Sequence, residues 1–231
     1  MRDIHCHILP GVDDGARTLE ESLQMLQAAK DAGITSIVCT PHCRSPYFDF
    51  DKMWSAFHLL KSKAGGFPLQ MGFEVNVAKL KRLGLEWADR LHFDGSDEFL
   101  LELEDEANEI DFREYNRIIY ELQGRGYRII IAHPERYKAI QKNPGLATDL
   151  MRNGCKLQAS ADFLNGGRTL SIGGGKIKKT AVKLFEDMRY SYIASDAHNA
   201  KHYKAFKKAV ATYDLRAVSY THLTLPTTRS V

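Results

Sequence analysis

The N-terminal end of the chain carries an unusual density of side chains that bind metals or transfer protons. The opening segment DIHCHILPGVDDG contains His5, His7, Asp13 and Asp14. Successive side chains of an extended strand point to opposite faces, so the H-x-H spacing places both imidazoles on one face. Cys6, between them, is expected to point the other way. Two imidazoles on one face can chelate one ion, so the opening predicts part of a metal site.

Further histidine and acidic residues occur in, or directly after, β-rich runs along the chain. They are His42 in ITSIVCTPH, Glu74 in LQMGFEV, Glu102 and Glu104 in EFLLELED, His133 in YRIIIAHPERY, and Asp196 and His198 in SYIASDAHN. Imidazole and carboxylate ligands without thiolate suit zinc, manganese or iron. A carboxylate such as Glu74 can bridge two ions. Because histidines recur at the ends of separate runs, the pattern predicts a metal centre rather than a set of structural histidines.

These β-rich runs alternate with helical patterns. Residues 18–32 carry leucines at helical spacing behind a capping Thr18, and the pair Asp111 and Glu114 has the capping-box spacing of a second helix. Seven β-rich runs are present when DIHCH is counted, and their alternation with helices predicts a parallel sheet. Seven parallel strands in so short a chain favour a barrel, in which working residues lie at the C-terminal strand ends. Only the run CKLQASA offers no ligand.

The composition narrows the class of protein. The chain has 231 residues, 44% of them hydrophobic, and a formal charge of +3, which is too balanced to favour nucleic acid or an anionic membrane as a partner. No C-x-x-C pair, signal peptide or bilayer-spanning apolar run is present. We therefore expect a cytoplasmic protein that is not inserted in a membrane. Its thiols are expected to be free; they are Cys6, Cys39, Cys43 and Cys155.

The last residues differ in character from the rest. Residues 1–217 are expected to form a single domain. The segment VSYTHLTLPTTRSV, residues 218–231, has no helical period and resembles the translation of a sequencing-library adapter. We expect this segment to be a non-native tail, in which case the natural C-terminus would be absent.

Several segments in order, between residue 2 and about residue 215, resemble one known family. They are DIHCHILPGVDDGA, TPH, LLELE, GYRIIIAHPERY and ASDAHN. Together they are similar to the bacterial PHP (polymerase and histidinol phosphatase) superfamily. Within it they most resemble the metal-dependent protein-tyrosine phosphatases of capsule and exopolysaccharide operons. The combination of HPERY with SDAHN is fairly specific to that branch.

The resemblance implies a distorted seven-stranded β/α barrel of PHP type that binds three metal ions, with manganese expected and iron or zinc as alternatives. Arg136, three residues after His133, would bind the phosphate and act in catalysis. The implied metal ligands are His5, His7, Asp14, His42, Glu74, Glu102, His133, Asp196 and His198. The implied partner is the phosphotyrosine tail of a membrane-associated bacterial tyrosine kinase that controls capsular or exopolysaccharide synthesis. An oligomer is compatible with the sequence.

One position departs from the family pattern. The family has a second phosphate-binding arginine shortly after SDAHN, where this chain reads AKHYKAFKK and has Tyr203. Lys201 or Lys204 is expected to take part of that substrate-binding role, although lysine lacks the bidentate fork of arginine. On this alignment, Tyr203→Arg is expected to raise kcat/KM.

Several other functions were weighed against this one. A cysteine phosphatase needs an arginine six positions after its cysteine, and these positions hold Val12, Ser45, Asp49 and Ala161. A PHP phosphatase for a small monoester such as histidinol phosphate stays open, whereas the balanced charge disfavours one acting on nucleic-acid ends. An amidohydrolase would need a metal-bridging lysine, for which no clear candidate exists. A metal-stabilised scaffold would not need open coordination positions.

Overall fold

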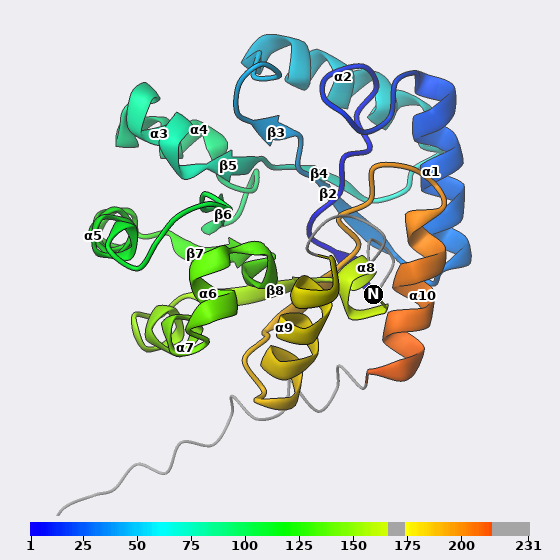
Figure 1. Cartoon of the computed structure of the whole chain (residues 1–231). Helices are drawn as coiled ribbons and strands as arrows, with labels where there is room; N and C mark the ends of the chain where they lie inside the picture. The colour runs from blue at the N-terminus through cyan, green and yellow to red at the C-terminus, as the bar shows by residue number, and fades with distance from the viewer. Residues whose placement is uncertain (166–173, 214–231) are drawn as a thin grey trace, which may run out of the picture.

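A computed structural model gives the arrangement of residues 1–165 and 174–213. The expected tail at 218–231 lies outside these residues, as does the end of the expected domain 1–217. Short parallel strands alternate with helices along the described chain, and helices surround the strands (Figure 1). Among the described helices, none is both long enough and apolar enough to cross a bilayer.

The strands pair only in parallel within the two sheets of the described residues. One sheet has the order β1-β2-β4, and the other, which curls, has the order β3-β5-β6-β7-β8-β9. Their bounds are β1 Arg2–Asp3, β2 Ser36–Cys39, β3 His42–Cys43, β4 Leu69–Met71, β5 Glu74–Asn76, β6 Glu98–Glu102, β7 Arg128–Ala132, β8 Lys156–Ser160 and β9 Tyr192–Ala194. Each predicted β-rich run contains at least part of a strand, and the predicted parallel α/β fold is confirmed.

The helices follow the predicted alternation. Their bounds are α1 Leu19–Asp31, α2 Phe50–Lys63, α3 Val77–Leu83, α4 Ala88–Leu91, α5 Asp111–Gly124, α6 Lys138–Lys142, α7 Gly145–Arg152, α8 Ala161–Asn165, α9 Gly174–Glu186 and α10 His202–Thr212, with 3-10 turns η1 Leu85–Trp87 and η2 Pro134–Arg136. Thr18 caps α1 as predicted, since its hydroxyl accepts the Glu21 N–H. The capping box predicted for α5 is wrong, because Asp111 accepts the Asn108 N–H in the preceding turn.

The segment after β1 connects the ends of the two sheets. The Thr40 N–H, just beyond β2, donates to the Cys6 carbonyl at 2.9 Å. On the other side, Cys6 forms a parallel bridge with Ala197, and the Asp196 N–H donates to the His5 carbonyl at 2.9 Å. The first and last strands of the described fold therefore lie side by side. This pairing brings the N-terminal histidines next to the SDAHN segment.

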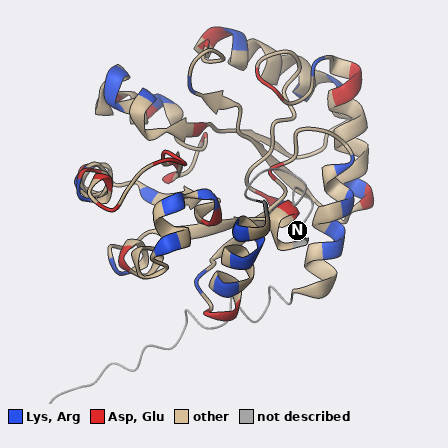
Figure 2. Ribbon diagram, viewed as in Figure 1, with Lys and Arg blue, Asp and Glu red and all other residues tan. Residues whose placement is uncertain are grey.

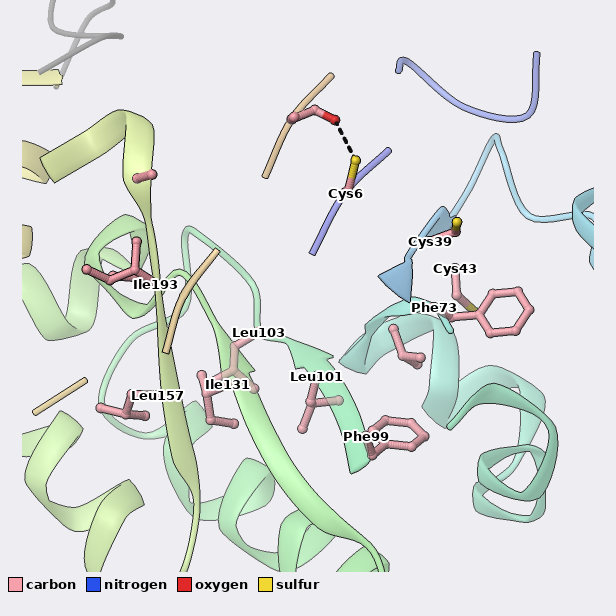
Figure 3. Packing of buried hydrophobic residues seen from close by; sticks show 14 of the residues in the cluster. Cys6, Cys39, Cys43, Phe73, Phe99, Leu101, Leu103, Ile131, Leu157 and Ile193 are labelled. Carbon is pink, nitrogen blue, oxygen red and sulfur yellow. Dashed lines mark hydrogen bonds between the residues drawn. The ribbon is translucent and has the colours of Figure 1, made fainter. Parts of the chain in front are cut away.

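Strand alternation separates two apolar layers. Phe99 and Leu101 of β6 join the large cluster that packs against the helices, part of which is drawn in Figure 3. Leu100 belongs to a smaller cluster on the opposite face of the sheet, whose members are Ile4, Val38, Phe93, Leu100, Ile130, Ala132 and Ala194. Residues two apart share a face, so Glu102 follows Leu100 on this inner face. The inner face is thus apolar along the strands and acidic at the C-terminal end of β6.

The side chain of Tyr203 on α10 lies in the interior. It is 1% exposed, and its hydroxyl lies 2.9 Å from the Cys6 sulfur and 3.4 Å from Asp3 Oδ2. The expectation that an arginine at this position would reach the phosphate is therefore wrong, because α10 turns residue 203 into the core. The same contact confirms that the Cys6 thiol points away from the imidazoles of His5 and His7.

Tyr203→Arg is predicted to lower the free energy of unfolding by about 3 kcal/mol or more, because a charged side chain of different shape would have to leave water and fit a packed interior. Chemical denaturation monitored by circular dichroism would measure the change. Lys204→Arg is the matched control, since residue 204 is exposed on the same helix and the variant should stay within about 0.5 kcal/mol of the parent. A Tyr203→Arg variant as stable as the parent would contradict this account of the core.

Candidate metal centre

The nine residues expected to bind metal lie together in the fold. Their ligand atoms fall into four groups, and within each group all of the atoms lie within 4.8 Å of one another. The groups are His7, Asp14, His42 and His198; His5, His7 and Asp196; His5, Glu74 and His133; and His42, Glu74 and Glu102. Within the described chain, these groups contain all nine expected residues and no others.

Strand ends and strand pairing produce this arrangement. His42 is the first residue of β3 and pairs in register with Glu74, the first residue of β5. Glu102 ends β6, and His133 directly follows β7. The register places the starts of β3 and β5 beside the ends of β6 and β7, because Glu74 pairs with Leu100 and Leu101 pairs with Ile131. The spatial cluster therefore follows from sequence positions that are otherwise far apart.

Glu74 is the central anion of the cluster. Its carboxylate is 1% exposed and lies 2.6 Å from His42 Nδ1, 2.7 Å from His133 Nε2 and 3.3 Å from His5 Nε2. Burial by itself would raise the pKa of Glu74. The positive charges of His5 and His42 outweigh that effect and hold the pKa well below its usual value. Glu74 is thus a charged carboxylate in the interior.

Some of the surrounding groups hold protons more tightly than usual, whereas burial lowers the pKa of His7 and His133. Burial lowers the pKa of His5, but the carboxylates of Glu74 and Asp196 outweigh it and raise the pKa to about 9. Burial likewise opposes Glu74 and Asp14 at His42, whose pKa rises to about 10. Burial and the neighbouring Glu74 raise the pKa of Glu102 to about 7. A divalent cation would have to displace these protons in order to bind.

The unsatisfied atoms of the cluster fit a cation. His42 Nδ1, Glu74 Oε2 and Glu102 Oε2 are buried and lack a hydrogen-bond partner. The contact of 2.6 Å between the first two is an ion pair rather than a hydrogen bond. A buried polar atom without a partner costs about 1–3 kcal/mol. Lone pairs that converge on a common space are satisfied by a cation placed there. The donor set of imidazole nitrogen and carboxylate oxygen suits manganese, iron or zinc.

Neighbouring polar groups orient two of the histidines. Nδ1 of His5 lies 2.8 Å from Gln158 Oε1, and Nδ1 of His7 lies 2.9 Å from Asp13 Oδ2. Each oxygen accepts an N–H and leaves Nε2 facing the cluster, as is usual for metal-binding histidines. Sequence reasoning gave Gln158 no role. Its signal is a buried amide between the apolar residues Leu157 and Ala159 of β8.

Two of the expected ligands have a backbone conformation that is uncommon outside glycine. His133 has φ of 29° and Asp196 has φ of 47°. Such residues cost roughly 1–3 kcal/mol each and persist where the surroundings hold them in place. At these two positions the chain breaks the strand alternation and turns the side chain into the cluster.

The HPERY segment supplies both a ligand and its support. After His133, the buried Glu135 accepts the Ser160 N–H at 2.8 Å and the Tyr190 hydroxyl at 2.9 Å. Tyr137 donates its hydroxyl to the Ala132 carbonyl at 2.6 Å. These bonds fix η2 between β7 and β8, and so fix the direction of Arg136.

Two guanidinium groups border the cluster. Arg136 on η2 donates to Asp105 Oδ2 at 2.7 Å and lies 3.4 Å from His133 Nε2. Arg44, two residues after His42, places Nη2 2.9 Å from His42 Nε2 and Nη1 3.4 Å from the nearer oxygen of Glu102. Sequence reasoning identified Arg136 and missed Arg44. The signal that was missed is the spacing of two residues between His42 and Arg44. In an extended segment this spacing places both side chains on the same side of the chain.

The two candidate lysines lie farther out. Lys201 borders a hollow of about 640 Å³ that Asp14, Arg17 and His198 also line. Lys204 is exposed on α10 and does not line that hollow. The structure therefore brings Lys201 to the rim of the cluster and leaves Lys204 on the outer surface.

Gly15 allows the acidic loop to approach the first histidines. A Cβ at residue 15 would collide with the backbone carbonyl and the Cβ of His7. The Gly15 N–H also donates to Asp13 Oδ1 at 3.0 Å, the carboxylate that orients His7. The absence of a side chain here lets Asp13 and Asp14 reach the cluster.

Gly15→Ala is predicted to reduce bound manganese, because the loop must move away from His7. Metal content after equilibration with Mn²⁺ would be measured by elemental analysis. Gly124→Ala is the control, since a Cβ at that helical position meets no atom within 4 Å. Equal metal content in the two variants would show that the close approach at residue 15 has no influence on the centre.

Comparison with known proteins assigns the family. The profile for capsular polysaccharide synthesis proteins of the CpsB/CapC type matches residues 1–216. The chain belongs to the CpsB/CapC family. It is 35% identical over 205 residues to a CapC protein of Staphylococcus aureus, covering 86% of this chain and 77% of that one. It is 32% identical over 207 residues to tyrosine-protein phosphatase YwqE of Bacillus subtilis, covering 87% and 78% respectively.

Solved structures agree with this assignment. The chain matches a structure from work on YwqE of Bacillus subtilis and CpsB of Streptococcus pneumoniae, described there as metal-dependent tyrosine phosphatases. The TM-score is 0.77 at 27% identity, and the match covers 95% of this chain and 90% of that one. A prolidase, at 13% identity and a TM-score of 0.51, shares the fold alone. The resemblance read from the sequence is confirmed, and these relatives support phosphotyrosine over histidinol phosphate.

Proposed function

We propose that the chain uses divalent cations to hydrolyse phosphotyrosine in proteins, and that its physiological target is a membrane-associated tyrosine kinase of capsule or exopolysaccharide synthesis. One observation carries the proposal: nine imidazole and carboxylate ligands converge beside two arginines. The family supports it, since its relatives include proteins named tyrosine-protein phosphatases.

The proposed cofactor is Mn²⁺, with iron or zinc as alternatives, and the proposed number of ions is three. The four ligand groups share residues. This overlap supports a cluster in which neighbouring ions are bound by common side chains, rather than separate ions. His5, His7, His42 and Glu74 each belong to two groups. Adjacent ions held by shared ligands are one established way to stabilise displacement at a phosphoryl group.

We propose that the strands amount to the seven-stranded barrel of the PHP type, within a single domain spanning 1–217. β2 and β3 are separated by two residues, as are β4 and β5, so each pair counts as one bent strand. The bridge between Cys6 and Ala197 supports closure between the first and last strands.

The chain's own residues have clear tasks in this reaction. When bound, divalent cations neutralise phosphoryl oxygens and lower the pKa of water. Phosphotyrosine brings a charge of about −1.5 to −2, and Arg136 can contact two of its oxygens through the guanidinium fork. Arg44 would supply a second guanidinium, near His42 and Glu102. Lys201 would add a positive charge at the rim. Tyrosine has a pKa of about 10, so its phenolate leaves without a strong general acid.

The proposed location is the cytoplasm, where the four cysteines would stay reduced. All four are free and buried. Burial raises the pKa of Cys43 and Cys155 to about 12, so these thiols are poor nucleophiles.

An assay with and without metal tests the proposed function. Protein freed of metal by chelation should show no turnover of a phosphotyrosine peptide, and Mn²⁺ should restore it. Histidinol phosphate should be hydrolysed far more slowly. Full activity in protein shown by elemental analysis to lack metal, or a preference for histidinol phosphate, would contradict the proposal.

Arg136→Ala is predicted to lower kcat/KM on the same peptide by about one to two powers of ten, because a charge-assisted contact contributes roughly 1.5–3 kcal/mol. Metal content should not change. Arg136→Lys should recover only part of the activity, since lysine cannot form the fork. Arg113→Ala, on the exposed face of α5, is the matched control. Parental kcat/KM in Arg136→Ala would exclude a phosphate contact.

A further inference from the structure

A groove lined by lysines lies between α6 and α9, outside the metal centre. It encloses about 800 Å³. Its lining includes five lysines and no acidic residue; they are Lys138, Lys142, Lys176, Lys179 and Lys183. The whole chain has a net charge of only +3, so the groove concentrates more positive charge than the chain carries overall. Figure 2 shows this charge on the two neighbouring helices.

The spacing of three lysines on α9 places their side chains along the groove. Lys176, Lys179 and Lys183 are spaced three and four residues apart, so they share one face of the helix. Ala181 and Leu184 are buried and anchor the helix against the core. The lysine row is therefore held along the groove by packing on the other side.

Most of this charge lacks an acidic partner within the described part of the chain. Lys138 pairs with Glu106 at 2.6 Å, and Lys183 pairs with Asp187 at 3.2 Å. Lys142, Lys176 and Lys179 form no ion pair with any residue whose position the structure describes. Like charges on neighbouring turns repel each other, and cations near a helix N-terminus oppose its dipole. An anionic ligand in the groove would relieve both effects.

The groove adjoins the proposed phosphate site through η2. Lys138 is two residues from Arg136, so their Cα atoms are at most about 7 Å apart. Gln141, which lines the groove, donates to the backbone carbonyls of Glu135 and Arg136 at 3.0 Å each. η2 packs against both α6 and α9. One face of this turn therefore belongs to the metal centre, while the other side borders the groove.

We propose that the groove binds an acidic segment of the polypeptide that carries the phosphotyrosine. The inference rests on the proposed function and adds a substrate preference to it. The volume is in the range of ligand sites, which are roughly 300–1,000 Å³, and it suits a short stretch of chain. A small aryl phosphate held at Arg136 would not extend to the lysines, whereas a peptide would. Acidic side chains next to the phosphotyrosine thus strengthen binding without altering the chemical step.

The triple variant Lys142→Gln, Lys176→Gln and Lys179→Gln tests this proposal. Its substrates are a phosphotyrosine peptide with acidic residues on both sides, the same peptide with neutral amides, and p-nitrophenyl phosphate. KM for the acidic peptide should rise about tenfold, since each exposed charge contact contributes roughly 0.2–1 kcal/mol. kcat, and the kinetics on the other two substrates, should not change. High salt should abolish the parent's preference for the acidic peptide.

Two further variants serve as controls. Lys52→Gln, Lys61→Gln and Lys63→Gln remove the same charge from the exposed surface of α2 and should leave KM unchanged. Replacing the three groove lysines with arginine should preserve the preference, because the charge is kept. Equal KM values for the acidic peptide in the parent and the groove variant would overturn the proposal. Binding of the parent and the groove variant to anionic phospholipid vesicles would also be measured. A groove variant that lost vesicle binding but kept the preference for the acidic peptide would likewise overturn the proposal.

Failure of the inference can be told apart from failure of the proposed function. An inactive parent on p-nitrophenyl phosphate and on both peptides would contradict the phosphatase assignment. Fluorescence anisotropy of a labelled acidic peptide with phenylalanine in place of phosphotyrosine would still report on the groove. Weaker binding in the groove variant than in the α2 variant supports the proposal, and equal binding overturns it.

Discussion

The negative charge on Glu74 is the constraint around which the centre of this protein is organised. A charged carboxylate in the interior is costly unless cations or hydrogen-bond donors surround it. Here His5, His42 and His133 approach it from three segments that are far apart in the sequence. Each of these positions requires correct strand pairing. The protons on His5 and His42 stabilise the Glu74 carboxylate. Both histidines also belong to the candidate metal centre, so the charge balance of the interior and the proposed metal binding depend on one set of groups.

A layer of supporting residues keeps this arrangement in place. Gln158 and Asp13 set the direction of two imidazoles, and Gly15 lets the acidic loop close against the first strand segment. The left-handed backbone of His133 and Asp196 stores strain that the surrounding hydrogen bonds offset. The centre therefore depends on residues that bind no metal themselves, and precise placement of the ligands is shared between several elements.

Charge outside the centre is distributed in a way that fits a peptide substrate. Arg136 and Arg44 stand beside the ligands, where phosphate would lie, and the lysine groove begins on the other side of η2. Gln141 connects the two regions through the backbone of the turn. On the proposals above, affinity for the polypeptide and affinity for the phosphate would come from separate groups, and substrate preference could then change while the chemistry stays the same.

The sequence by itself determined the β-rich runs, their alternation with helices and the histidines at the run ends, whereas the full set of nine expected ligands came from the family resemblance. These features are local, because side-chain alternation and the position of a histidine at a strand end can be read from neighbouring residues. The family resemblance could be read for the same reason, since its motifs are short and continuous. One local prediction failed, the capping box of Asp111 and Glu114. The Asp111 carboxylate instead accepts the Asn108 N–H in the preceding turn.

Only the tertiary structure decided which side chains support the ligands and which point elsewhere. Tyr203 shares the apolar helical face of Phe206 and Ala209, but its contact with Cys6, 197 positions away in the sequence, is set only by the way α10 packs. Gln158 meets His5 across 153 positions of sequence. The lysine groove likewise needs α6 and α9 to pack together. Such contacts depend on the relative placement of distant elements, which is set by the packing of the whole core rather than by any one segment.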